Sequence, residues 1–153
     1  MREAIGGTWL FGLVITFIVF FASFLAVSIN YSKAFNVKNN VVDLISKYEG
    51  NNCAARKKIG NYLSDVGYLV PSKCPAGYNG YDLKGNKVAS GKAYYCVSKD
   101  KTETLSTLKK QYYRVIVFFR LDLPMLGDLF TFRINGETES ISFAVDQSDK
   151  YYC

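Results

Sequence analysis

An uninterrupted apolar run, Trp9 to Ile29, is the strongest pattern in the chain. The run has no charge, no proline and no amide side chain. As a helix its roughly 21 residues would span about 31 Å, the thickness of a bilayer's hydrocarbon core. In lipid, a lone segment can satisfy its backbone hydrogen bonds only as a helix. The pattern therefore predicts a transmembrane helix over residues 9–30, preceded by a short cytoplasmic segment, residues 1–8.

The flanks and the few polar side chains of this run agree with a membrane span. Trp9 and Tyr31 flank it as interfacial aromatic residues do. The hydroxyls of Thr16, Ser23 and Ser28 can be satisfied within a helix. A cleaved signal peptide is the alternative, but its apolar segment is usually no longer than about 15 residues. No small-x-small cleavage site ends the run either.

After the span, the apolar positions contract to one face of a helix. They recur at spacings of three and four, while lysine, asparagine and aspartate occupy the other sides. This packing stripe consists of Ala34, Val37, Val41, Leu44, Ile45 and Tyr48. No proline or glycine interrupts the pattern before Gly50, a suitable C-terminal cap, so we expect one helix from about Thr8, as its N-cap, to Glu49. The stripe must be buried, either by the chain's own head, chiefly by residues 112–123, or by a neighbouring copy.

The remaining residues predict a small head. A helical pattern predicts a second helix over Cys53–Asp65, with apolar positions Ala55, Ile59, Tyr62, Leu63 and Val66. A loop is indicated by Pro71, Pro75, Gly77 and Gly80. Branched and aromatic residues predict strands at Lys92–Ser98, Tyr112–Leu123, Leu129–Ile134 and Thr138–Val145.

The connections complete the predicted fold. The polar segment Lys99–Lys109 predicts a loop or a helical turn, LPMLGD predicts a turn, and Asn135-Gly136 predicts a hairpin. The fold class is α+β: a long N-terminal transmembrane helix continues into an amphipathic helix, which packs on a small antiparallel β-sheet. Residues 31–153 form this extracytoplasmic domain.

Four cysteines are spread along the head: Cys53, Cys74, Cys96 and Cys153. An even count at wide spacing, behind a membrane anchor, favours two disulfides formed in an oxidising compartment. Three pairings are open. Zinc is the alternative, but zinc sites prefer ligand pairs at short spacing, and the chain has no C-x-x-C pair and no histidine. Basic residues flank both ends of the span, so the cysteines decide the orientation and place the head outside the cytoplasm.

The formal net charge of +6 would suit a nucleic-acid partner, but the basic residues are scattered and no run of them resembles a nucleic-acid-binding arm. We therefore expect a solvated surface and no nucleic acid. The chain has no histidine and no glycine-rich phosphate loop. Carboxylates such as Asp65, Asp82 and Asp122 are isolated. We expect no enzymatic activity, no cofactor, no metal ion and no small-molecule substrate.

A long apolar helix, an amphipathic continuation and a disulfide-bearing head together resemble pilin-like subunits. The run into Ile29-Asn30-Tyr31 and the segment VIVFFRLDLPMLGDLFTFRINGETESI further resemble TadE-like proteins, minor subunits of tight-adherence (Flp-type) pilus systems. In that family a strand, a proline-and-glycine turn and a second strand ending in a polar stretch follow one another. The turn here is Leu123–Gly127. The resemblance covers both ends of the chain and leaves out Cys53–Lys110.

This resemblance implies a structural subunit of a surface pilus or of its assembly machinery, held in the cell membrane. Its partners would be the lipid bilayer, other pilin-like subunits and pilus assembly proteins. Pilin-like precursors usually carry a glycine cleavage site and a glutamate five residues after it; here Gly6 and Gly7 are followed by no such glutamate, which leaves processing open. The alternative is a membrane-anchored extracytoplasmic binding module that works alone through its aromatic head.

Overall fold

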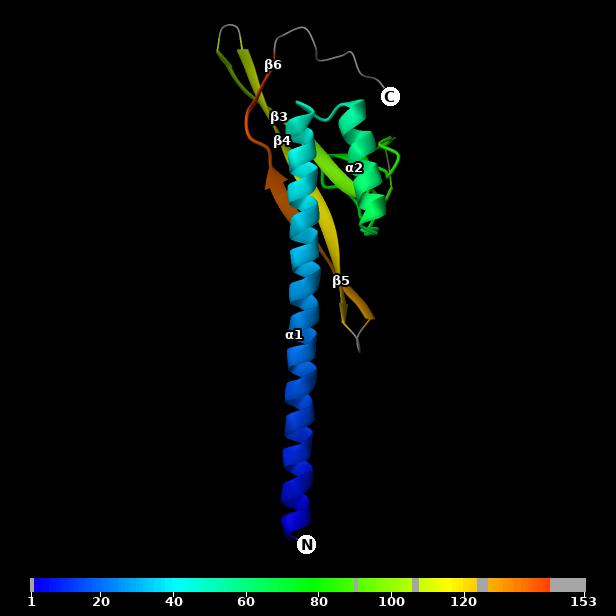
Figure 1. Ribbon diagram of the computed structural model, residues 1–153, viewed down its shortest axis with the longest axis vertical. Coiled ribbons are helices and arrows are strands. Elements are labelled where there is room, and N and C mark those ends of the chain that lie inside the picture. The colour runs from blue at the N-terminus through cyan, green and yellow to red at the C-terminus, as the bar shows by residue number, and fades with distance from the viewer. Residues whose placement is uncertain (1, 90, 106–107, 124–126, 144–153) are drawn as a thin grey trace.

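The protein, described by a computed structural model for residues 2–89, 91–105, 108–123 and 127–143, is a long helix that carries a small head at its C-terminal end (Figure 1). Helix α1 spans Arg2–Lys47 and helix α2 spans Cys53–Asp65. The strands, all paired antiparallel, are β1 (Asn79–Tyr81), β2 (Lys87–Val88), β3 (Tyr95–Leu105), β4 (Leu108–Leu123), β5 (Gly127–Glu137) and β6 (Ile141–Phe143). The predicted α+β class is confirmed.

Helix α1 continues without a break through the change from an all-apolar to a one-sided pattern. Its 46 residues would extend about 69 Å at the standard rise. The helix begins at Arg2, so the prediction that Thr8 caps it is wrong. The helix extends through residues 4–7, AIGG, although two successive glycines disfavour a helix by their backbone entropy.

A short joint reverses the chain between α1 and α2. The amide N–H of Gly50 donates to the carbonyl of Ile45 at 2.8 Å, and Gly50 has a φ of 141°. The left-handed position at the helix end, which usually favours glycine, is held by Glu49 with a φ of 55°, and the predicted cap Gly50 follows it. The side-chain amide of Asn52 then donates to the carbonyl of Tyr48 at 2.8 Å and accepts from the amide of Ala55 at 2.9 Å. One residue thus satisfies the end of the first helix and the start of the second.

Strand β4 is the centre of the sheet. Along one edge β4 pairs with β3, which pairs in turn with β1, and β1 pairs with β2. Along its other edge, residues 109–111 of β4 pair with β6 and residues 114–123 pair with β5. Thr138 lies between the last two strands. Its amide donates to the carbonyl of Tyr113 at 3.0 Å, and its hydroxyl accepts from the amide of Tyr113 at 2.9 Å. The strand predicted over Thr138–Val145 starts later, in β6, and residues 144 and 145 lie outside the described residues.

The prediction of a loop or helical turn at Lys99–Lys109 is wrong. Strand β3 continues to Leu105 and β4 starts at Leu108, with Lys99 paired to Tyr113. These strands extend beyond the end of α1 (Figure 1), where no helix covers them. Strand pairing is made by backbone groups and does not require alternating apolar residues, so a polar sequence can form a strand here.

The predicted hairpin at Asn135-Gly136 is also wrong. Both residues lie within β5, where Asn135 pairs with Ile116 and Gly136 with Val115. A Cβ added at Gly136 would lie only 2.8 Å from Cδ of Lys38 on α1. Glycine is needed here because β5 passes close to the helix, and not because a turn requires its backbone freedom.

The main core of the head lies between α1 and the sheet. Four stripe residues are fully buried there, Leu44 packs half-buried against them, and Tyr48 is half-buried. The four are Ala34, Val37, Val41 and Ile45. They belong to one cluster with the buried face of β4, which consists of Tyr113, Val115, Val117 and Phe119. Burial of each large aliphatic side chain is worth about 1.5–3 kcal/mol, a substantial part of a small domain's stability.

Val41→Asp in the full-length protein should therefore unfold the head. The change removes a buried valine and places an unpaired carboxylate in an apolar core, so we expect a loss of about 3 kcal/mol or more in the free energy of unfolding. Thermal unfolding in detergent, followed by near-ultraviolet circular dichroism, measures it. Asn39→Asp, on the exposed side of the same helix, is the matched control and should melt like the wild type. An unchanged melting curve for Val41→Asp would contradict this description of the core.

Candidate membrane anchor and crosslinked head

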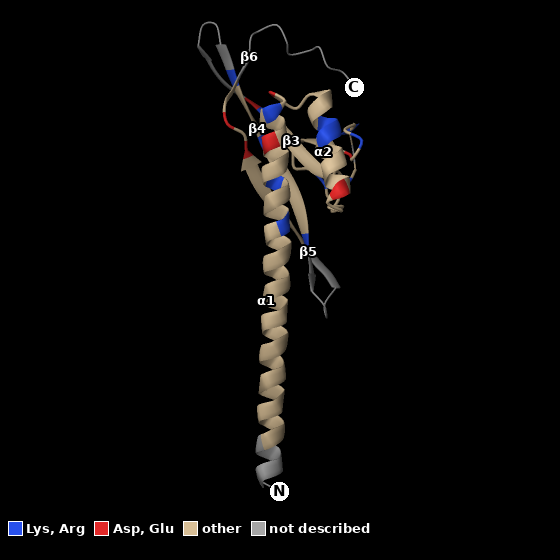
Figure 2. Ribbon diagram, in the orientation of Figure 1, with Lys and Arg blue, Asp and Glu red and all other residues tan. Residues whose placement is uncertain are grey.

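The N-terminal half of α1 is an apolar rod without protein neighbours among the described residues. Every side chain from Gly7 to Ala22 is exposed, including Trp9 at 73% and Phe20 at 67%. Figure 2 shows no charged residue along the described part of this half of the helix. Within the described part of the chain, α1 is the one helix long and apolar enough to cross a membrane. It is the candidate anchor, in agreement with the predicted span.

The hydroxyl groups of the apolar run are satisfied within the helix. Thr16, Ser23 and Ser28 each donate to the carbonyl four residues earlier, at 2.9, 2.8 and 3.0 Å. This confirms the sequence prediction for these three side chains. Lipid could therefore surround the helix here without meeting an unpaired hydroxyl.

One side of the upper apolar run is covered by the head. Ser23, Ala26 and Val27 are partly buried, as is Asn30, and their spacing continues the line of the packing stripe down from Ala34. The small side chains at 23 and 26 let the sheet approach the helix on this side. Within one apolar run, α1 is therefore exposed on every side before Ser23 and partly covered by the head from Ser23 onward.

A second core lies on the sheet face opposite α1. Its buried members are Ala93, Cys96, Ile116 and Phe118, and the chain between α2 and β1 packs over them. Five successive apolar residues, Val115–Phe119, place apolar side chains on both faces of β4. The run was therefore a signal in the sequence for burial on both faces of the strand, beyond the predicted contact of residues 112–123 with the packing stripe.

A disulfide between Cys74 and Cys96 fastens the covering segment to β3, with a Cα–Cα distance of 5.8 Å. The sequence left three pairings of the four cysteines open. The bond between Cys74 and Cys96 is part of only one of them. Gly80, predicted as part of a loop, lies in β1, where an added Cβ would come within 2.9 Å of the Cys74 sulfur. Cys53, the first residue of α2, is also disulfide-bonded. Cys153 lies outside the described residues.

Tyrosines contribute to the core of the head. Tyr68, Tyr81 and Tyr95 are buried, as is Tyr113. The hydroxyl of Tyr68 donates to the carbonyl of Phe118, and the ring of Tyr81 stacks on that of Tyr95 with centroids 5.4 Å apart. Burial raises the pKa of Tyr68 and of Tyr95 far above the ordinary tyrosine value, so both hydroxyls stay neutral. These rings therefore serve packing and are not open to a ligand.

An exposed ion-pair group lies across three strands on the outer face. Arg114 of β4 contacts Asp100 of β3 at 2.8 Å and Glu137 of β5 at 2.7 Å. The hydrogen bond to Glu137, together with the charge of Asp100, raises the already high pKa of Arg114. The three side chains are well exposed, so solvent weakens the attraction and the group contributes little to stability.

No cluster of three or more metal-ligating side chains occurs among the described residues. Comparison of the chain with models of known protein families, with curated proteins and with solved structures finds no match in any of the three.

Replacing both Cys74 and Cys96 by serine should lower the free energy of unfolding by about 3 kcal/mol, because the disulfide closes a loop of 22 residues. Urea unfolding of the full-length protein in detergent measures this loss. The double substitution is preferable to a reducing agent, which would also reduce the bond at Cys53. A Ser72→Ala variant, beside the same loop, is the control. Equal urea midpoints for the double variant and the wild type would show that the disulfide does not hold the second core together.

Proposed function

We propose that this protein is a membrane-anchored, pilin-like structural subunit of a surface pilus or of its assembly machinery, similar to TadE-like proteins. The observation that carries the proposal is that one helix serves as anchor and as core of the head. Helix α1 is uninterrupted from Arg2 to Lys47. One face of its C-terminal half is buried against β4, and its N-terminal half is exposed and apolar.

This continuity suits a subunit whose head must be held in a defined position. In a filament, contacts between neighbouring anchor helices have to determine where the heads lie, which requires a stiff connection. A receptor that works alone only needs to remain attached, and a flexible glycine- or proline-rich linker is sufficient for that. Between Ile29 and Gly50 the chain has no glycine and no proline, and α1 is helical throughout as far as Lys47.

The exposed half of α1 suits two kinds of neighbour in turn. Before assembly it would be surrounded by the acyl chains of the lipid bilayer. During assembly it would pack against the apolar helices of other pilin-like subunits or of assembly proteins, through close van der Waals contact. Exposed aromatic side chains such as Phe20 and Phe24 lie on this half, at 67% and 61% exposure.

The disulfide supports the proposed location. A bond between Cys74 and Cys96 is typical of an oxidising compartment, and it therefore supports a head outside the cytoplasm and an N-terminus inside. The proposed role requires no catalysis, cofactor, nucleic acid or small-molecule substrate. A stand-alone binding module is the second candidate, but the burial of Tyr68, Tyr81, Tyr95 and Tyr113 removes much of the aromatic surface that it would use.

Photo-crosslinking in the native cell distinguishes the two functions. A benzophenone amino acid in place of Phe20 puts a reactive ring on the exposed anchor. Ultraviolet light should then give adducts with a second copy or with another protein that has an apolar N-terminal helix, both identified by mass spectrometry. The matched position is Leu69, 52% exposed on the head. Adducts at Leu69 together with none at Phe20 would favour the stand-alone module and contradict the structural subunit.

A further inference from the structure

The uncharged part of α1 is longer than a bilayer requires. Between Glu3 and Lys33 the chain carries no charged side chain, which gives about 29 residues and about 43 Å of helix, against a hydrocarbon core of about 30 Å. Hydrophobicity alone therefore does not determine the depth of the helix. The span could be residues 9–29, as the apolar run by itself predicts, or a segment nearer to the N-terminus.

A two-stranded extension of the sheet runs beside the upper part of this segment. The ring of Tyr31 on α1 meets Phe119 of β4 edge-on, with centroids 6.0 Å apart, and Phe119 stacks on Phe132 of β5 at 5.2 Å. From there β4 continues toward the N-terminal end of α1 as far as Leu123, and β5 returns from Gly127. We call residues 118–123 with 127–133 the lower hairpin.

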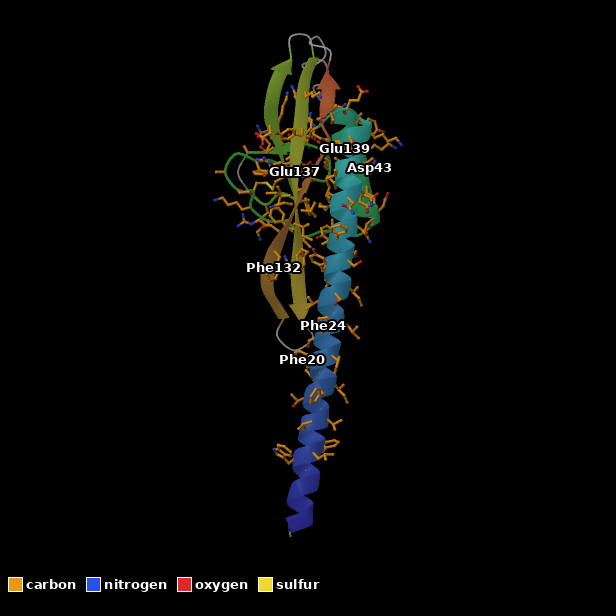
Figure 3. All side chains as sticks on the ribbon, turned by 90° about the vertical axis from the view of Figure 1, so that its left-hand side faces the viewer. Phe20, Phe24, Asp43, Phe132, Glu137 and Glu139 are labelled. Atoms are coloured by element: carbon orange, nitrogen blue, oxygen red, sulfur yellow. A yellow bond between two sulfur atoms is a disulfide. The ribbon has the colours of Figure 1, made fainter. Side chains whose placement is uncertain are left out.

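The lower hairpin reaches well down the apolar run. Four residues of strand beyond Phe119 cover about 13 Å. Figure 3 shows the two strands alongside α1 as far as the turn that carries Phe24. Burial along the helix agrees, because Ser23 is the first partly buried residue and every side chain from Gly7 to Ala22 is exposed.

The lower hairpin is unsuited to hydrocarbon because of its backbone. The β3–β4 ladder starts at the pair Tyr95–Val117, so beyond Val117 the register gives β4 only β5 as a partner strand. In this part of the described chain, one edge of each strand consequently has no partner strand. Unpaired amide and carbonyl groups are strongly disfavoured in lipid, where open sheet edges do not occur.

The charged side chains of the lower hairpin also make it unsuited to hydrocarbon. It carries Arg120 and Arg133, and its last pairs bring Asp122 opposite Asp128. Immersion of Phe24, Leu25 and Ile29 of α1 would favour a deeper position. The free energy gained by immersing these three apolar side chains is smaller than the cost of immersing four charged side chains and the open edges of two strands.

We propose that the lower hairpin rests in the headgroup layer of the outer leaflet and sets the depth of α1, so that residues 4–22 cross the hydrocarbon. The partner of this surface is the lipid headgroup layer. This hydrated, charged layer suits both the hydrogen-bonding edges of the lower hairpin and its charged side chains of both signs, and it adjoins the end of the span. The inference requires that α1 spans a membrane, and it does not require pilin-like assembly.

The single tryptophan reports the depth directly. With residues 4–22 in the hydrocarbon, Trp9 lies about 6 Å from the bilayer midplane; with residues 9–29 it lies about 15 Å from it, at the inner boundary. A tryptophan at position 24 would differ in the opposite sense. It would lie about 16 Å from the midplane with residues 4–22 in the hydrocarbon, and about 8 Å from it with residues 9–29.

The experiment uses the full-length protein in phosphatidylcholine vesicles whose acyl chains are brominated either near the methyl end or near the glycerol end. Trp9 fluorescence should lose more intensity with bromine at the methyl end. In the Trp9→Phe, Phe24→Trp variant, bromine at the glycerol end should be the stronger quencher.

The reverse pattern, a shallow Trp9 and a deep tryptophan at 24, would overturn the inference while leaving α1 as a span. Shallow positions for both would also overturn it, and would show that α1 lies along the membrane surface. Neither result depends on other subunits, so failure of the proposed pilus function would leave this test unaffected.

Discussion

Because all of its interior backbone hydrogen bonds lie within the helix, α1 can pass from lipid into a protein core without a break. Only its side chains have to change. Below Ser23 they are apolar and exposed on every side, from Ser23 to Asn30 one side is partly covered, and from Ala34 onward a stripe is fully buried. The orientation of the head relative to the anchor therefore follows from which side of α1 carries that stripe, and no separate linker has to fix it.

Strand β4 is the counterpart of this helix within the head. It is buried on both faces, by α1 on one side and by the segment held through Cys74–Cys96 on the other. A head of little more than a hundred residues has limited core of its own, and small extracytoplasmic domains commonly add disulfides for this reason. The bond is placed where the covering segment has no regular secondary structure of its own to hold it, between α2 and β1.

The sequence predicted the helices better than the strands, for physical reasons. A period of 3.6 residues and a suitable cap at Gly50 mark α1, and the bounds of α2 agree with prediction. The Asn135-Gly136 pair misled because its local turn preference yields to the close approach of α1 to Gly136. The polar end of β3, from Lys99 onward, was missed because its pairing with β4 does not require an alternating apolar pattern. The pairing of Cys74 with Cys96 depends on the contact of the covering segment with β3, which spacing along the chain does not encode.

The continuity of α1 between anchor and head is the claim on which the rest depends, and hydrogen–deuterium exchange of the full-length protein in lipid nanodiscs tests it most directly. The decisive amides are those of residues 29–38, where the helix leaves the apolar run and enters the head. We expect slow exchange through this segment, at rates comparable with those of the buried turn around Val41, and no fast-exchanging gap. Rapid exchange confined to residues 29–38 would reveal a hinge between two independent parts and would contradict the single stiff helix.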